Sequence, residues 1–86
     1  MMHKTWFDEA WEDYLYWQTQ DKKTLKRINL ILKDIERHPF EGIGKPVPLR
    51  ADLSGLWSRR IDEKNRLVYL IRDNALHIFS CRGHYE

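Results

Sequence analysis

The sequence contains a single cysteine and no long apolar run, and these two absences exclude several classes of protein. One cysteine cannot form a disulfide within the chain, so stability does not depend on oxidation. Cys81 lies in the apolar run 78–81 and is interpreted as a small buried residue rather than a nucleophile. No segment is long enough to span a membrane, and the first residues lack the apolar region of a signal peptide. We therefore expect a cytoplasmic protein.

Recognisable metal and nucleotide motifs are also missing. The four histidines are scattered without a zinc-binding spacing, and no Cys-x-x-Cys pair exists. Residues 42–45, Gly-Ile-Gly-Lys, lack the strand–loop–helix setting that a phosphate-binding loop needs. Ser54 and Ser58 lack the context of a nucleophilic serine. We therefore expect no metal and no cofactor, and a Ser–His hydrolase is disfavoured.

The chain has enough large side chains for one small core. Its 86 residues leave room for a single domain, which we expect to cover residues 1–86. Four Trp, four Tyr and three Phe supply the most buried area per residue, and this helps a small core to offset its conformational entropy.

Positive charge is concentrated in the middle of the chain. Residues 45–72 contain seven basic and three acidic side chains, whereas the segments on either side each carry a net charge of −1. Five of the seven are arginines, which can bind phosphate through two hydrogen bonds. The block indicates either a surface that binds nucleic acid or a solvated sheet face.

The first half of the sequence has the pattern of two helices. Asp8 is a candidate N-cap, and Asp21 marks the start of a second helix. This second helix has a clear apolar stripe at three- and four-residue steps. The stripe consists of Leu25, Ile28, Leu32 and Ile35. Pro39 disfavours helical geometry before it, so the helix should end near His38.

The second half has the pattern of strands. Residues 57–61, 66–72 and 75–81 are β-prone, and the short turns between them imply antiparallel pairing. Residues 3–7 are a candidate short strand, and Val47, between two prolines, is a candidate edge strand. We predict an α+β fold with two N-terminal helices packed on one face of an antiparallel sheet. The other face carries arginines among apolar residues, as a binding groove would.

Acid–base chemistry on RNA is compatible with these residues. RNA carries its own nucleophile, the 2′-hydroxyl, so cleavage without a metal needs a base, an acid and a cation at the phosphate. His84 and Arg66 are candidates for the last two functions. Taken singly, each has an ordinary explanation, because a histidine at this position can be part of a mobile tail and Arg66 can be a surface charge.

Several strings of the sequence resemble the YoeB toxins of the RelE superfamily. They are residues 13–17, 39–42, 44–46, 53–55, 57–61, 66–69 and 84–85. The resemblance runs in order along essentially the whole chain. Its most specific parts are the blocks WSRRI and RLVY together with the final His-Tyr pair.

The resemblance implies a RelE-like microbial ribonuclease fold and the toxin of a type II toxin–antitoxin system. Such a protein would enter the A site of the bacterial 30S ribosomal subunit and cleave mRNA without a metal, leaving a 2′,3′-cyclic phosphate and a 5′-hydroxyl. A YefM-type antitoxin would inhibit it, and operator DNA would be reached only through the complex of the two proteins. The resemblance also implies a homodimer.

The resemblance also assigns roles to individual residues. Arg66 would stabilise the phosphate in the transition state, His84 would be the general acid, and Tyr85 would help to position the substrate. The basic positions that contact RNA or the ribosome would be Lys45, Arg50, Arg59 and Arg60.

One position departs from the family pattern Lys-Pro-Glu-Pro-Leu, in which the Glu is the general base. Here residues 45–49 read Lys-Pro-Val-Pro-Leu, and Val47 cannot accept a proton. Glu86 is a smaller departure, since it follows the tyrosine that normally ends the family sequence. The sequence leaves open whether Val47 is a change that lowers toxicity or a natural substitution with another carboxylate as the base. The candidate carboxylates are Glu41, Asp62, Glu63 and Glu86.

Two functions remain open at this point. The first is an endoribonuclease toxin whose rate is reduced by Val47. The second is a catalytically inactive relative that binds antitoxin, operator complex or ribosome without cleaving. A generic single-strand RNA-binding domain would explain the basic block, but not the His-Tyr pair or the match along the whole chain.

Overall fold

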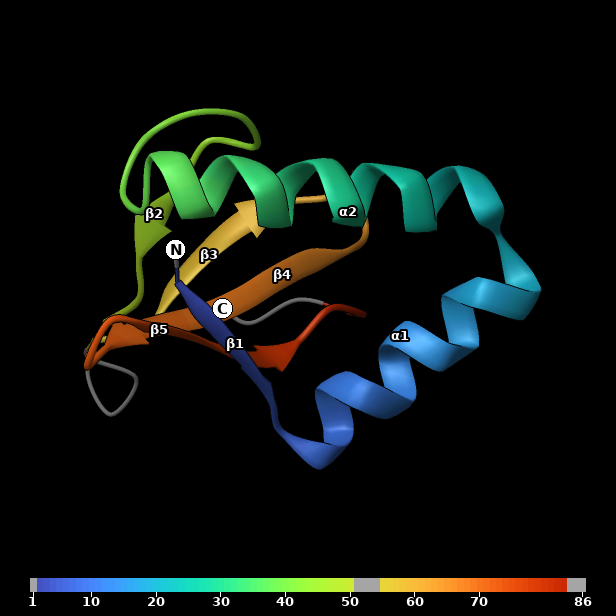
Figure 1. The fold of residues 1–86 in the computed structure, drawn as a ribbon. Helices are drawn as coiled ribbons and strands as arrows, with labels where there is room; N and C mark the ends of the chain where they lie inside the picture. The colour runs from blue at the N-terminus through green and yellow to red at the C-terminus, as the bar shows by residue number, and fades with distance from the viewer. Residues whose placement is uncertain (1, 51–54, 84–86) are drawn as a thin grey trace.

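The computed structural model of the protein describes residues 2–50 and 55–83. The elements are β1 (His3–Trp6), α1 (Asp8–Gln20), α2 (Lys22–Arg37), β2 (Val47–Pro48), β3 (Trp57–Arg60), β4 (Arg66–Arg72) and β5 (Ala75–Ser80). The strands form one sheet in the order β1-β5-β4-β3-β2, with the two helices beside it (Figure 1). The predicted α+β fold is confirmed.

The sheet is mixed rather than purely antiparallel, and in this respect the prediction is wrong. β1 pairs with β5 in parallel, from His3 opposite Ala75 to Trp6 opposite Ile78. The other three pairings are antiparallel. The difference has a physical reason. Turn residues identify pairing only between consecutive strands, whereas a parallel pair needs a long crossover, which α1 and α2 provide here.

The two helices begin differently. α1 has Phe7 as its N-cap, without a capping side chain, so the expected capping role of Asp8 is wrong; Asp8 and Glu9 instead lie in the first turn, where the helix dipole favours acids. Asp21 is the N-cap of α2, as predicted, and its Oδ1 accepts from the backbone N–H groups of Lys23 and Thr24 at 3.0 and 3.3 Å. Within the described ranges, no helix has the length and apolar character needed to cross a bilayer.

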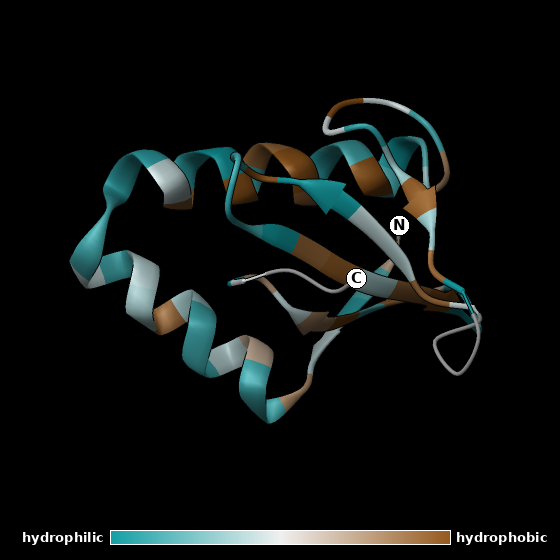
Figure 2. Ribbon diagram, turned by 180° about the vertical axis from the view of Figure 1, so that it is seen from behind, coloured by the Kyte–Doolittle hydropathy of each residue, from teal (hydrophilic) through white to brown (hydrophobic). Residues whose placement is uncertain are grey.

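The core lies between the helices and one face of the sheet. Both helices contribute to it, together with alternate residues of β4 and β5; its members include Trp17, Ile28, Ile31, Leu32, Ile35, Leu67, Tyr69, Leu76 and Ile78. The apolar stripe of α2 faces this core, as the hydropathy colouring in Figure 2 shows. Full burial of one such aliphatic side chain contributes roughly 1.5–3 kcal/mol, so the stripe is a main source of the free energy that docks α2 on the sheet.

The strand connections give the sheet its register. β4 and β5 are joined by Asp73 and Asn74, which both have positive φ (53° and 58°), as the two central residues of a type I′ hairpin turn require. Between β3 and β4, the carboxylate of Asp62 accepts from the backbone N–H groups of Lys64 and Asn65, each at 2.8 Å. Both turns lie where the sequence predicted them.

Candidate nucleic-acid interface

The sheet face opposite the core carries Val47 and two of the predicted basic residues. Val47 lies opposite Ser58, and Ser58 lies opposite Val68. Directly opposed residues share a face, as do residues two apart in one strand. Arg60 and Arg66 are opposite each other and two residues from Ser58 and Val68 respectively. Val47, Arg60 and Arg66 therefore share one face, which we call the open face, although Ser58 and Val68 on the same face are themselves buried.

The strand register gives the distance between position 47 and Arg66 across the open face. Position 47 is separated from β4 by two strand spacings, or about 10 Å, and Arg66 lies two residues, or about 7 Å, further along. The corresponding Cα separation is on the order of 12 Å. Long side chains at both positions can therefore reach a ligand that lies between them. Val47 is 48% exposed, so the side chain at this position is available to such a ligand.

Arg60 and Arg66 form a pair of like charges. Opposed like charges destabilise an antiparallel pair unless an anion or solvent offsets their repulsion. Arg60 is exposed, and Arg66 is half-buried with its Nη1 donating to the carbonyl of Asp62 at 3.0 Å. Among the described residues, no carboxylate forms an ion pair with either arginine. The pair is therefore suited to bind a phosphate.

The described C-terminal segment lies beside Arg66. The Arg66 backbone N–H donates to the carbonyl of Gly83 at 2.7 Å, and the Gly83 N–H donates to Asn65 Oδ1 at 2.8 Å. His84 and Tyr85, the predicted acid and positioning residues, lie outside the described residues, as does Glu86. In sequence they follow Gly83 directly.

Arg59 does not contribute to the open face, and its predicted contact with RNA requires correction. Its side chain is 0% exposed and points to the helix side of β3. The guanidinium pairs with Asp34 of α2 at 2.6 Å, and also donates to the hydroxyl of Tyr69 at 3.2 Å. Neighbouring arginines in a strand point to opposite faces, so only one of Arg59 and Arg60 can reach a ligand on the open face.

Arg59 instead holds the loop that leads to β2. It donates to the backbone carbonyls of His38, Glu41 (2.8 Å) and Ile43 (3.1 Å). The hydrogen bond from Arg59 lowers the pKa of the Asp34 carboxyl below its ordinary value, against a smaller opposing effect of burial. The Arg59 guanidinium thus fixes the chain between α2 and β2 by satisfying carbonyls that a loop would otherwise leave without partners.

Lys45 and Arg50 are both exposed and lie in the segments that flank β2. The carbonyl of Gly44 accepts the N–H of Arg60 at 2.6 Å, which brings Lys45 next to the end of β3. Gly44 has φ of 81°, and a Cβ there would lie 2.9 Å from the Arg60 carbonyl, so this close approach requires glycine. Lys45 and Arg60 are thereby neighbours at one edge of the sheet.

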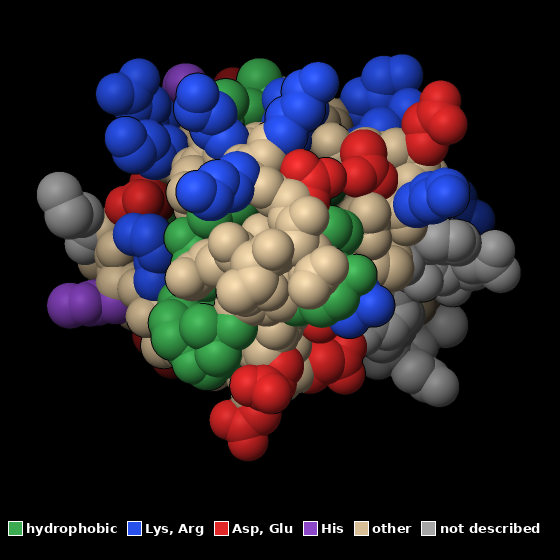
Figure 3. Space-filling view, turned by 90° about the vertical axis from the view of Figure 1, so that its right-hand side faces the viewer, with side chains coloured by type: hydrophobic (Ala, Val, Ile, Leu, Met, Phe, Trp, Pro, Cys, Tyr) green, Lys and Arg blue, Asp and Glu red, His purple; other side chains and the backbone are tan. Residues whose placement is uncertain are grey.

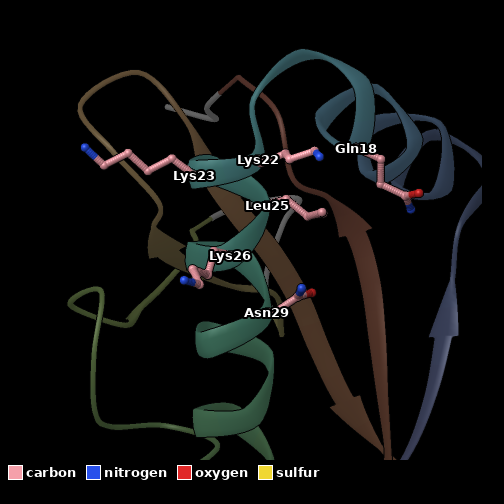
Figure 4. Close-up of a pocket in the computed structure, with 6 residues that line it drawn as sticks. All are labelled: Gln18, Lys22, Lys23, Leu25, Lys26 and Asn29. Carbon is pink, nitrogen blue, oxygen red and sulfur yellow. The ribbon is translucent and has the colours of Figure 1, made fainter.

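A second basic surface was not singled out from the sequence. A hollow between α1 and α2 is lined by Gln18, Lys22, Lys23, Leu25, Lys26 and Asn29 (Figure 4). The space-filling view shows further Lys and Arg side chains gathered along the top of the molecule, over α2 (Figure 3). The first turn of α2 has no acidic residue, although the helix dipole favours acids there. Lysines in place of acids at the start of this helix were the feature of the sequence that could have indicated a basic surface.

Among the described residues, the other titratable groups do not indicate a reactive thiol or a metal site. Burial raises the pKa of the Cys81 thiol to about 12, and the nearby Asp13 carboxylate adds to this, so Cys81 is the buried structural residue predicted from the sequence. In residues 2–50 and 55–83, no three His, Cys, Asp or Glu side chains are grouped to hold a metal ion. The chemistry of the open face is that of guanidinium and ammonium groups.

Comparison with known proteins gives a consistent result. A family model described as "YoeB-like toxin of bacterial type II toxin-antitoxin system" matches residues 6–85. Toxin YoeB of Escherichia coli O6:H1 is 57% identical over 84 residues, covering 98% of this chain and 100% of the relative. Toxin YoeB of Synechocystis sp. is 62% identical over 77 residues, covering 90% of each chain.

Solved structures agree with these sequence matches. The YoeB dimer from Staphylococcus aureus superposes with a TM-score of 0.92 at 48% identity, covering 98% of each chain. The YoeB–YefM complex from the same organism contains a chain with a TM-score of 0.91 at 46% identity, covering 99% of each. The chain therefore belongs to the YoeB-like toxins of bacterial type II toxin–antitoxin systems.

Proposed function

We propose that this toxin is a ribosome-dependent endoribonuclease that cleaves mRNA without a metal and thereby inhibits translation. The observation that carries the proposal is the opposed pair Arg60 and Arg66 on the open face. Arg66 is also hydrogen-bonded to Gly83, the residue before His84. A cation that binds a phosphate, next to a segment that carries a histidine, is the arrangement that RNA cleavage through the 2′-hydroxyl requires.

The proposed reaction uses three groups of the chain. The 2′-oxygen attacks the neighbouring phosphorus while the bond to the 5′-oxygen breaks, which gives a 2′,3′-cyclic phosphate and a 5′-hydroxyl. Arg66 stabilises the charge that develops on the phosphate, His84 donates a proton to the departing 5′-oxygen, and Tyr85 positions the substrate. Val47 occupies the position at which a general base would take the proton of the 2′-hydroxyl.

The absence of a base at position 47 sets the expected rate. Loss of a general base typically reduces the rate by about 10²–10⁴-fold. We therefore propose that the chain folds and binds RNA as an active toxin would, and that it cleaves slowly. The contacts with mRNA and with the 30S A site come from Lys45, Arg50 and Arg60, whereas Arg59 is excluded from this set by its burial.

Solved structures of relatives suggest which partners this toxin binds. A Staphylococcus aureus relative has been solved in a complex with YefM and another as a YoeB dimer. We propose that a YefM-type antitoxin binds and inhibits this chain, that the toxin forms a homodimer, and that it reaches operator DNA only within the antitoxin complex. The proposed location is the bacterial cytoplasm, where ribosomes and mRNA are present.

Val47 also supports a second candidate function. Without a base, the chain would act as a catalytically inactive relative that occupies the antitoxin, the operator complex or the ribosome. The two candidates make opposite predictions about cleavage and the same prediction about binding. Cleavage on ribosomes therefore separates them.

The test is Val47→Glu, which supplies a carboxylate at the proposed position of the base. Val47 is exposed on an edge strand, so the larger side chain fits without disturbing the core. We expect cleavage of ribosome-bound mRNA to rise by about 10²–10⁴-fold. Val47→Gln is the matched control, because glutamine has the size of glutamate but cannot take the proton.

The outcomes are distinct. Weak cleavage by the unsubstituted sequence and a large gain only in Val47→Glu support the weakened nuclease. No detectable cleavage by the unsubstituted sequence, with a gain in the variant, supports the inactive relative. If Val47→Glu and Val47→Gln cleave no faster than the unsubstituted sequence, position 47 does not carry the base and the proposal is wrong.

A further inference from the structure

The side chain of Asn65 joins the strand that carries Arg66 to the segment that precedes His84. Its Oδ1 accepts the backbone N–H of Gly83 at 2.8 Å. One residue further along, the backbone N–H of Arg66 donates to the carbonyl of Gly83 at 2.7 Å. Both polar groups of the Gly83 backbone are therefore bound to the start of β4.

Asn65 is itself held in one orientation. Its Nδ2 donates to both carboxylate oxygens of Asp62, each at 3.1 Å, so Oδ1 must face Gly83. Partial burial alone would raise the pKa of the Asp62 carboxyl, but hydrogen bonds from the Asn65 side chain and from backbone N–H groups outweigh it and lower the pKa. Asp62 is therefore ionised at neutral pH and remains an acceptor for Asn65.

The residues between β5 and Gly83 are fixed from the helix side. Asp13 accepts the backbone N–H of Cys81 at 3.0 Å, and Trp17 Nε1 donates to the Cys81 carbonyl at 2.9 Å. The Arg82 guanidinium lies 3.6 Å from the centroid of the Tyr16 ring. Up to Arg82 the chain is thus held by α1, and at Gly83 it is held by β4.

Asn65 is the side chain on which this last attachment depends. The hydrogen bond from the Arg66 N–H involves backbone atoms only and does not depend on the side chain of Asn65. In the part of the chain that the structure describes, no side chain other than Asn65 hydrogen-bonds to Gly83. Gly83 has φ of 76°, so the chain turns sharply here and its direction depends on how the Gly83 amide is held.

We infer that Asn65 is a positioning residue of the nuclease site: by binding the Gly83 N–H, it fixes the point from which His84 and Tyr85 continue, next to Arg66. This inference rests on the proposed function. A general acid contributes fully only when it is held within reach of the leaving group, and a displacement of about 1 Å can cost on the order of 10²-fold in rate. Asn65 acts through Gly83 and touches no reacting atom.

The experiment compares Asn65→Ala with its parent, both in the natural sequence and in the Val47→Glu background. Amide hydrogen exchange followed by NMR reports the anchoring directly. We expect the Gly83 amide to exchange about tenfold faster in Asn65→Ala, as loss of one hydrogen bond predicts. In the Val47→Glu background, kcat should fall about 10- to 100-fold while KM changes less than about twofold, because substrate contacts remain and only the acid is misplaced.

Two further variants separate positioning from general stability. Thr5→Ala is the control, since it removes an exposed side chain whose Oγ1 is hydrogen-bonded to His77 Nδ1 at 2.6 Å where β1 pairs with β5. It should change neither Gly83 exchange nor kcat. The double variant Asp62→Asn with Asn65→Asp exchanges the amide and the carboxylate. The amide at position 62 can then donate to the carboxylate at position 65, and that carboxylate can still accept the Gly83 N–H. The double variant should recover most of the lost kcat.

The outcomes also separate this inference from the proposed function. If Gly83 exchange is unchanged in Asn65→Ala, the anchoring is wrong whatever the activity. If the Val47→Glu parent cleaves and its Asn65→Ala variant cleaves equally fast, the role in catalysis is wrong although the proposed function stands. If neither the unsubstituted protein nor Val47→Glu cleaves mRNA, the proposed function fails, and the catalytic role of Asn65 fails with it. The exchange data still decide whether Asn65 anchors Gly83.

Discussion

Arg59 and Arg60 are adjacent residues of β3 whose side chains leave the strand on opposite faces. Arg59 pairs with Asp34 and binds three loop carbonyls in the interior, whereas Arg60 is exposed opposite Arg66. Strand alternation predicts that one of the two faces the core, but the sequence does not say which. The answer depends on carbonyls of residues 38–43, whose positions are set by the loop and not by local pattern.

The same substitution should therefore lower the free energy of unfolding strongly at Arg59 and hardly at all at Arg60. Arg59→Gln removes a fully buried guanidinium from its ion pair with the partly exposed Asp34, which should cost on the order of 3 kcal/mol. Arg60→Gln removes an exposed charge and should change the free energy of unfolding by less than about 0.5 kcal/mol. Urea unfolding of both variants beside the natural protein checks this. Equal losses in the two variants would show that Arg59 is not the structural member of the pair.

At the scale of elements, prediction from the sequence succeeded where local signals are strong. The apolar stripe and the Asp21 N-cap located α2, and short polar turns located β3, β4 and β5. The parallel pairing of β1 with β5 could not be predicted, because it joins segments separated by both helices and has no turn to mark it. The start of α1 was misplaced by one residue, since an aspartate is favourable both as N-cap and within the first turn.

The link between α2 and β3 predicts a dependence of stability on pH. Because the folded-state pKa of Asp34 is lowered by the hydrogen bond from Arg59, the ionised carboxylate stabilises the fold. This contribution is fully present above the ordinary carboxyl pKa of about 4 and is lost as the pH falls through the lower folded value. Asp34→Asn should therefore destabilise the protein most above pH 4, and the difference from the natural protein should narrow as the pH falls toward 2.

Urea unfolding of the natural protein and of Asp34→Asn at a series of pH values measures this difference. Asp21 and Asp62 also have lowered pKa values, but they are unchanged in both proteins and cancel in the comparison. A difference that stays constant from neutral pH to the acid limit would contradict the role assigned to the ionised Asp34.

At the scale of the whole molecule, the sheet separates a side that packs on the helices from a side that carries Arg60 and Arg66, which we propose to be the binding side. The sequence indicated this division through the alternation in β4, and the structure places Leu67 and Tyr69 in the core and Arg66 on the open face. The relation of Val47 to Arg66 could not be predicted, because it depends on the pairing of a two-residue edge strand. The roles of His84 and Tyr85 remain predictions from family resemblance, since both lie outside the described residues.

The same division predicts how binding to the ribosome depends on salt. Each cationic side chain that contacts phosphate releases counterions, and the slope of log affinity against log salt changes by about 0.7–0.9 per contact. Lys45→Gln with Arg60→Gln removes two neighbouring charges at one edge of the sheet, so the magnitude of the slope should fall by about 1.4–1.8. The control is Lys33→Gln with Arg37→Gln, which removes two exposed charges of α2.

Sedimentation with ribosomes over a range of potassium chloride concentrations gives these slopes. The charge removed is the same in both double variants, so an effect of net charge alone would alter their slopes equally. A smaller slope only in Lys45→Gln with Arg60→Gln would place phosphate contacts at the sheet edge. Equal slopes in that variant and the natural protein would mean that these two residues face solvent in the complex, and that the ribosome is bound through another surface.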